Sequence, residues 1–113
     1  MSELTKQKPD LSPIKKLLDL IVETWSPKAI WLFGSRARGG AHPSSDWDLL
    51  VLVSDKVAEA GATDPFAAWN LRRRAKANAD LIVLSEEDFE EDSKTVNTLS
   101  YEVKLNGITV YEQ

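Results

Sequence analysis

At residues 46–53 the chain reads Asp46-Trp47-Asp48-Leu49-Leu50-Val51-Leu52-Val53. The run ends without polar alternation, which predicts a buried strand covered on both faces. Successive side chains of a strand point to opposite faces, so Asp46 and Asp48 project one way and Trp47 projects towards the core. Two carboxylates on one face of an apolar strand repel each other and resist desolvation. Because the core does not need them there, the pair indicates a divalent-cation site, and magnesium prefers such oxygen ligands.

A third acid opens the next apolar run. Asp80 lies at the start of the strand predicted over Ala79–Leu84, and it can join the first two acids if the two strands are neighbours. Three carboxylates could hold two magnesium ions about 3.5–4 Å apart, the usual arrangement for phosphoryl and nucleotidyl transfer. A helix-to-strand turn residue is the alternative for Asp80. Glu86 and Glu87 are less suitable third ligands, since they lie past the strand.

A glycine-serine turn follows the strand predicted over Ala29–Phe33. Gly34 lets the backbone approach a ligand closely, and N–H groups at a helix start favour phosphate. Ser35 can add a hydroxyl to such a site or cap the helix. Arg36 and Arg38 add positive charge suited to phosphate, and Arg36 is favoured as the one that points at the ligand. A surface role is the alternative for both arginines.

The rest of the chain predicts helices around these strands. The first expected helix runs from Ser12, as N-cap, to Trp25, and the second from Pro65, after the cap Asp64, to about Ala77. Phe66, Trp69, Ala75 and Ala77 are expected on the apolar side of the second helix. A short acidic helix capped by Ser85 with Asp88 follows, and a last helix runs from about Lys94 to Asn106 with Val96, Leu99 and Val103 inward. Ser54–Ala62 is expected to be a polar connection, Gly107 a helix stop, and Ile108–Tyr111 a last strand. The fold class is therefore α/β (α+β), with a three- or four-stranded mixed sheet flanked by helices.

Length and composition exclude several classes of protein. A chain of 113 residues is expected to form one domain, here 11–113 after a flexible N-terminus at 1–10. The absence of cysteine excludes disulfides and thiolate metal sites, and a single histidine argues against multi-histidine zinc sites. A net charge of −4 argues against a dedicated DNA or membrane binder. Without a long apolar run or a secretion signal, a cytoplasmic location is expected.

These motifs together resemble the nucleotidyltransferase superfamily that includes DNA polymerase beta, and the length resembles its minimal members. The resemblance runs from about residue 12 to the C-terminus. It is carried by the turn at 34–39, by the paired acids within 45–51 and by the strand at 79–83, which read Gly-Ser-Arg-Ala-Arg-Gly, Ser-Asp-Trp-Asp-Leu-Leu-Val and Ala-Asp-Leu-Ile-Val.

The resemblance implies a role for each motif residue. Gly34 and Ser35 would contact the β- and γ-phosphates of a nucleoside triphosphate. Asp46 and Asp48 would coordinate two Mg²⁺ ions, and Asp80 would bind the catalytic ion and help to activate the attacking hydroxyl. The family reaction moves a nucleoside monophosphate, here AMP from ATP, onto an acceptor hydroxyl and releases pyrophosphate.

The resemblance also implies a partner. Many members of this size pair with a small helical protein of the HEPN class in toxin–antitoxin modules, and the nucleotidyltransferase can be the antitoxin that adenylylates the toxin on tyrosine. Family analogy further suggests a homo- or hetero-oligomer that completes the site. The base, the acceptor and activity of the chain alone are left open.

Two other functions compete with transfer to a toxin. The chain could be a module that binds nucleotide or blocks a toxin without chemistry. It could also be an enzyme acting on RNA or a small molecule, which is ranked last because relatives with such substrates usually carry an additional domain that is not expected here. The run Arg72-Arg73-Arg74-Ala75-Lys76 is interpreted as a solvated helix face, with contact to a partner or RNA as the alternative. His42 is interpreted as a loop residue. Trp25, Trp31, Trp47 and Trp69 are expected in the core, although one partly exposed tryptophan could serve a partner interface.

Overall fold

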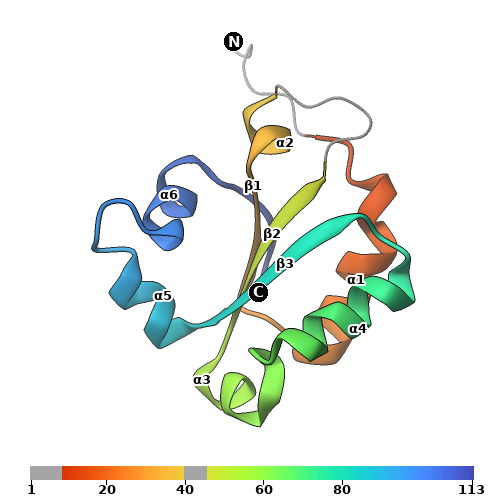
Figure 1. Ribbon diagram of the computed structural model, residues 1–113, viewed down its shortest axis with the longest axis horizontal. Helices are drawn as coiled ribbons and strands as arrows, with labels where there is room; N and C mark the ends of the chain where they lie inside the picture. Colours follow the sequence, from red (N-terminus) through yellow and green to blue (C-terminus); the bar gives the residue numbers. More distant parts are fainter. Residues whose placement is uncertain (1–8, 40–45) are drawn as a thin grey trace.

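A four-stranded mixed sheet forms the centre of the molecule, as the sequence predicts (Figure 1). The computed structural model describes residues 9–39 and 46–113. The strands are β1 (Ala29–Phe33), β2 (Trp47–Val53), β3 (Ala79–Ser85) and β4 (Ile108–Glu112), in the order β3-β2-β1-β4. β1 pairs antiparallel with β2 and with β4, whereas β2 and β3 run parallel. The parallel pair places the starts of β2 and β3 at the same edge of the sheet.

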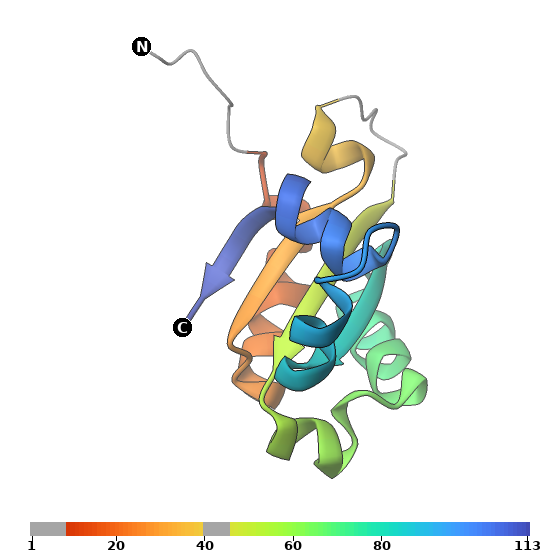
Figure 2. The ribbon, with the colours of Figure 1, turned by 90° about the vertical axis from the view of Figure 1, so that its left-hand side faces the viewer.

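Helices cover both faces of the sheet (Figures 1 and 2). α1 (Lys15–Trp25) and α4 (Pro65–Ala75) lie on one face, and α5 (Glu86–Asp92) and α6 (Leu99–Asn106) lie on the other. Alternate residues of β2 supply both cores: Leu49 and Val51 are buried with the α1 and α4 residues, and Leu50 is buried with Phe89 and Val103. The prediction that β2 is covered on both faces is therefore confirmed.

The first helix begins differently from the prediction. Ser12–Ile14 form a short 3₁₀ turn, η2, ahead of α1, and Ser12 is its first residue rather than the cap of an α-helix. The side chain that accepts hydrogen bonds at this helix start is Asp10. Its carboxylate accepts from the Ser12 backbone N at 3.0 Å and from Ser12 Oγ at 2.6 Å. Ser26 ends α1 in the left-handed conformation, with φ at 44°. Of the predicted flexible N-terminus, residues 1–8 lie outside the described part of the chain, as does His42.

The segment predicted to be a polar connection is helical instead. α3 (Asp55–Val57) is followed by a wider π-type turn, η3 (Ala58–Ala62). Ser54 caps α3, since its Oγ accepts a hydrogen bond from Val57 N at 3.2 Å. The polar composition hid this capped helix and the η3 turn after it, in which Ala62 is buried.

The predicted apolar side of α4 is wrong at Phe66 and Trp69, although Ala75 and Ala77 pack partly buried against the core as expected. Phe66 and Trp69 are 67% and 44% exposed, while Ala68 and Leu71 face the core. These smaller side chains recur at helical spacing and let the helix pack closely on the sheet. The expectation that Trp69 belongs to the core fails for the same reason, whereas Trp25 and Trp47 are buried.

The last helix is shorter than expected. α6 begins at Leu99, not near Lys94, because Asn97 takes a left-handed φ of 77° and Thr98 then caps the helix. Thr98 Oγ1 accepts from Tyr101 N at 3.2 Å. Val96 precedes this cap and is 61% exposed, so its predicted inward position is also wrong. Gly107 ends the helix with extended backbone, and β4 follows as predicted.

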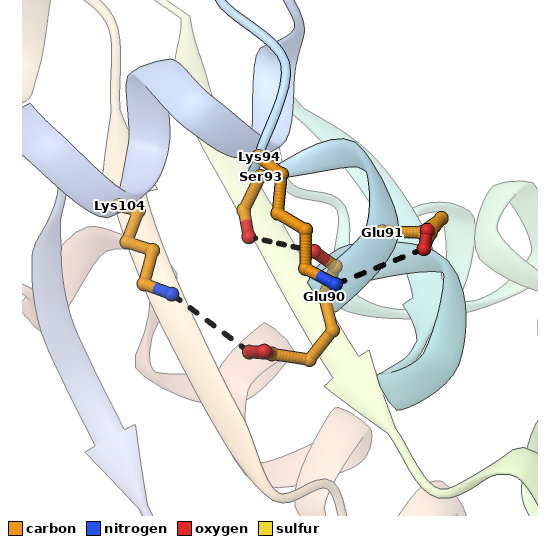
Figure 3. A network of polar contacts seen from close by, with 5 residues as sticks. All are labelled: Glu90, Glu91, Ser93, Lys94 and Lys104. Atoms are coloured by element: carbon orange, nitrogen blue, oxygen red, sulfur yellow. Dashed lines mark hydrogen bonds and ion pairs between the residues drawn. The ribbon is translucent and has the colours of Figure 1, made fainter.

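Charged side chains link α5 and α6 on the surface (Figure 3). Lys104 Nζ lies 3.8 Å from Glu90 Oε1, Lys94 Nζ lies 3.9 Å from Glu91 Oε2, and Ser93 Oγ donates to Glu90 O at 3.0 Å. Such exposed pairs stabilise a protein only weakly. Across residues 9–39 and 46–113, the helices are too short or too polar for any of them to cross a membrane.

Candidate active site

Two of the predicted acids face each other across neighbouring strands. Asp48 of β2 and Asp80 of β3 are directly paired in the parallel register. Side chains paired in this way project from the same face of the sheet. Asp48 is half-buried and Asp80 is exposed, so the pair lies where the sheet opens to solvent. The condition that the sequence left open, that β2 and β3 are neighbours, is met.

Asp48 lies in a site of concentrated negative charge. Burial raises its pKa above the ordinary aspartate value, and the charges of Asp80 and Asp46 raise it further. The Arg38 charge opposes this shift, and a side-chain hydrogen bond with Asp80 contributes to it. Asp46 itself lies just ahead of β2 and is exposed. The charges of both other predicted acids therefore act on Asp48.

The glycine-serine turn lies against this site. Gly34 follows β1 with φ 77° and ψ −157°, and a Cβ placed on it would overlap Oδ2 of Asp48. The turn leads into α2 (Ser35–Arg38), whose Ala37 N and Arg38 N bond to the Gly34 carbonyl at 3.1 and 3.2 Å. Gly34 is the N-cap residue, so Ser35 is not the cap and instead occupies the first helical position, half-buried.

The two arginines of α2 take different positions. The Arg36 guanidinium carbon lies 4.2 Å from the ring centroid of Trp47, whose side chain is buried on the α1 side of the sheet. Arg38 is exposed, and its charge acts on Asp48. Which of the two arginines faces a ligand stays a prediction.

Helix α4 contributes Arg72 to the site, although the sequence predicts a solvated helix face for the arginine run. Arg72 Nη1 donates to the Ala79 carbonyl at 2.8 Å and lies 3.6 Å from Asp80 Oδ1. A pocket of about 480 Å³ contains Asp48, Asp80 and Arg72 together with exposed Trp69. The sequence carried a hint of this contact, because the arginine run lies just ahead of the strand that Asp80 opens.

The chemistry of these donors fits a divalent cation. Carboxylate oxygens are the ligands that magnesium prefers, and a cation would offset the repulsion that raises the pKa of Asp48. In the described residues, however, no three acidic or histidine side chains are grouped closely enough to hold one ion. Binding of an ion by Asp46, Asp48 and Asp80 together stays a prediction.

Comparison with known proteins identifies the family. A crystal structure of a "putative nucleotidyltransferase" from Sulfolobus solfataricus has a TM-score of 0.60 and 20% identity, covering 98% of this chain and 94% of that one. A crystal structure of a toxin–antitoxin with AMP-PNP has a TM-score of 0.58 and 24% identity, covering 87% of this chain and 72% of that one. At these sequence identities the two structures support the fold alone. A search of curated proteins found no match to this chain. The family model described as "Polymerase beta, Nucleotidyltransferase" matches residues 15–113, and the chain therefore belongs to the polymerase beta nucleotidyltransferase family.

Proposed function

We propose that the protein is a Mg²⁺-dependent nucleotidyltransferase that moves AMP from ATP to a hydroxyl of an acceptor protein. The observation that carries this proposal is the direct pairing of Asp48 with Asp80 beside the Gly34 turn. The acceptor we propose is a small helical toxin of the HEPN class, and this chain is its antitoxin. Family membership supports nucleotidyl transfer. The nucleotide and the toxin partner are proposed by analogy with a protein of the same fold in a structure described as a toxin–antitoxin with AMP-PNP.

The proposal gives each group of residues one task. Asp46, Asp48 and Asp80 would hold two magnesium ions, which would supply Lewis-acid stabilisation of the charge that develops on the reacting phosphoryl group. Gly34 and Ser35 would receive the β- and γ-phosphates through backbone N–H groups and the serine hydroxyl. Arg36 and Arg38 would add positive charge near those phosphates, and the charge of Arg38 already acts on Asp48.

The reaction itself is a displacement at phosphorus. The acceptor hydroxyl oxygen forms a bond to the α-phosphorus as the bond from that phosphorus to the β-bridging oxygen breaks. Pyrophosphate leaves with the electron pair of the broken bond. The hydroxyl proton passes to the carboxylate of Asp80, which lies on the pocket side of Asp48, and then to solvent.

Label transfer tests this function. The purified protein is incubated with α-labelled ATP, Mg²⁺ and a lysate of its source, with the Asp48→Asn variant alongside. A discrete labelled protein band that requires Asp48 supports the proposal, and mass spectrometry then identifies the acceptor. Equal labelling by Asp48→Asn would reject the site.

One observation favours a second function. Because no three acids in the described part of the chain are grouped around an ion position, a module that binds nucleotide or blocks a toxin without chemistry is the alternative. Co-expression with the toxin separates the two. Inhibition that survives Asp46→Ala combined with Asp48→Ala indicates blocking by contact, whereas lost inhibition indicates chemistry.

A further inference from the structure

Helix α4 presents two large aromatic side chains to solvent. Phe66 and Trp69 are 67% and 44% exposed, and their ring centroids lie 5.2 Å apart. The Arg73 guanidinium carbon lies 5.3 Å from the Trp69 ring centroid. We name Phe66, Trp69, Arg73 and Lys76 the α4 surface. Tryptophan and arginine dominate the binding energy of protein interfaces, and adjacent exposed aromatics mark interaction sites.

The α4 surface is continuous with the candidate active site. Trp69 and Arg72 line the pocket that contains Asp48 and Asp80. The same two residues line a neighbouring groove of about 410 Å³, together with Arg73, Lys76 and Asp80. A molecule bound on the α4 surface therefore reaches Asp80 directly.

The order of the strands indicates which substrate reaches this side. Gly34 follows β1, on one side of Asp48, and Asp80 lies on β3, on the other side. In the proposed reaction the leaving pyrophosphate lies towards Gly34. Because the attacking and leaving oxygens lie roughly in line at phosphorus, the attacking hydroxyl enters from the Asp80 side. The α4 surface borders that side, so it faces the acceptor.

The charge distribution selects the kind of acceptor. Arg72, Arg73, Arg74 and Lys76 lie at the end of one helix, whereas the rest of the chain has ten basic and eighteen acidic residues. A long polyanion extending beyond this helix would be repelled by that acidic remainder. A folded protein can instead present a short acidic segment that matches the basic area alone.

We infer that the α4 surface docks an acidic segment of the acceptor protein and so delivers a hydroxyl to the pocket beside Asp80. The inference rests on the proposed function for the identity of the reaction. Docking itself involves no chemistry, so it can be measured separately.

A binding assay with a defined probe tests the docking. The probe is a fluorescent random copolymer of glutamate and tyrosine, which carries acidic, aromatic and hydroxyl groups, and single-stranded oligouridine is the comparison. We expect salt-sensitive binding of the copolymer that weakens about tenfold or more in Phe66→Ala/Trp69→Ala and in Arg73→Glu/Lys76→Glu. Leu105→Ala and Lys94→Glu, at exposed positions on the α6 side of the sheet, are the matched controls and should change affinity less than about twofold.

Each outcome of this assay bears on the docking inference alone. Asp48→Asn removes a negative charge near the α4 surface, so it should bind the acidic copolymer at least as tightly as the wild type even if the proposed chemistry is absent. Unchanged binding by both double variants, equal or tighter binding of oligouridine, or no copolymer binding would overturn the inference.

Steady-state kinetics with the acceptor found by label transfer give a second test. Trp69→Ala should raise the KM for the acceptor about tenfold and leave the KM for ATP within about twofold. The reverse split would show that Trp69 binds the nucleotide and would overturn the inference.

Discussion

Gly34 and Asp48 are packed so closely that a β-carbon on residue 34 would overlap the Asp48 carboxylate oxygen Oδ2. The same glycine has a φ of 77° and a ψ of −157°, a backbone conformation that is nearly restricted to glycine. The turn and Asp48 are thus in close contact, and the aspartate at position 48 requires glycine at position 34.

Replacement of Gly34 by alanine should therefore damage both fold and site. Backbone strain of this kind costs about 1–3 kcal/mol, and the overlap adds displacement of the Asp48 side chain. Chemical denaturation should show the lost stability, and nucleotide titration should show weakened binding. Gly61→Ala is the matched control, since Gly61 has a φ of 115° with open space around its Cβ position. Binding lost equally in both variants would contradict a specific role for the Gly34 turn.

Asp48→Asn should leave the metal-free protein as stable as the wild type or more so, because it removes one charge from a like-charged group. The raised pKa of Asp48 also fixes the sign of the pH dependence. Between the ordinary aspartate pKa and the raised one, the folded state binds more protons than the unfolded state, so the Asp48 contribution lowers stability as pH rises. The stability advantage of Asp48→Asn should be small below the ordinary aspartate pKa. It should grow as the pH rises from there through the raised pKa of Asp48. Urea denaturation over a pH series checks this, and a constant difference would refute it.

Magnesium should stabilise the folded wild type. A cation at the acids offsets the repulsion among them, and a ligand that binds only the folded state raises the unfolding temperature. Thermal unfolding with increasing MgCl₂ should show a saturable rise for the wild type and a smaller one for Asp48→Asn. Sodium chloride at equal ionic strength is the control, because it screens the repulsion among the carboxylates without supplying a divalent cation. Identical curves for both proteins would place any bound ion elsewhere.

Arg72→Ala should destabilise the junction between α4 and β3. Arg72 donates to the Ala79 carbonyl at 2.8 Å, a hydrogen bond from a charged donor that contributes about 1.5–3 kcal/mol when buried and less at this half-exposed position. Arg74→Ala, on the exposed face of the same helix, is the matched control and should change stability by less than about 0.5 kcal/mol. Denaturation midpoints measure both. Equal effects would show that the contact with Ala79 is not stabilising.

The sheet and its paired acids could be predicted because short-range patterns encode them. The apolar runs ending at Phe33 and Val53 gave β1 and β2 nearly residue for residue. Alternation along β2 put Trp47 in the core and Asp48 on the other face. What the patterns could not supply was the order of strands, which depends on long-range packing.

Helix α4 shows where such patterns fail. Phe66 and Trp69 have the apolar character of core residues, yet Ala68 and Leu71 pack on the sheet because smaller side chains allow close approach. The nearness of the arginine run to Asp80 in the sequence only hinted at the contact of Arg72 with Asp80, because that contact depends on how α4 lies across β3. The α4 surface and the pocket that contains Asp48 and Asp80 can therefore be recognised only in the three-dimensional structure.

Nucleotidyl transfer at the Asp48–Asp80 pair is tested most directly by following the α- and the γ-phosphate of ATP separately. Parallel reactions with the source lysate and Mg²⁺ receive ATP labelled at the α- or at the γ-phosphate, with wild type, Asp48→Asn and Asp80→Asn. We expect a labelled acceptor only from α-labelled ATP and only with wild type, while the γ-label appears in pyrophosphate. A labelled acceptor from γ-labelled ATP, or full labelling by either variant, would contradict nucleotidyl transfer at the Asp48–Asp80 pair.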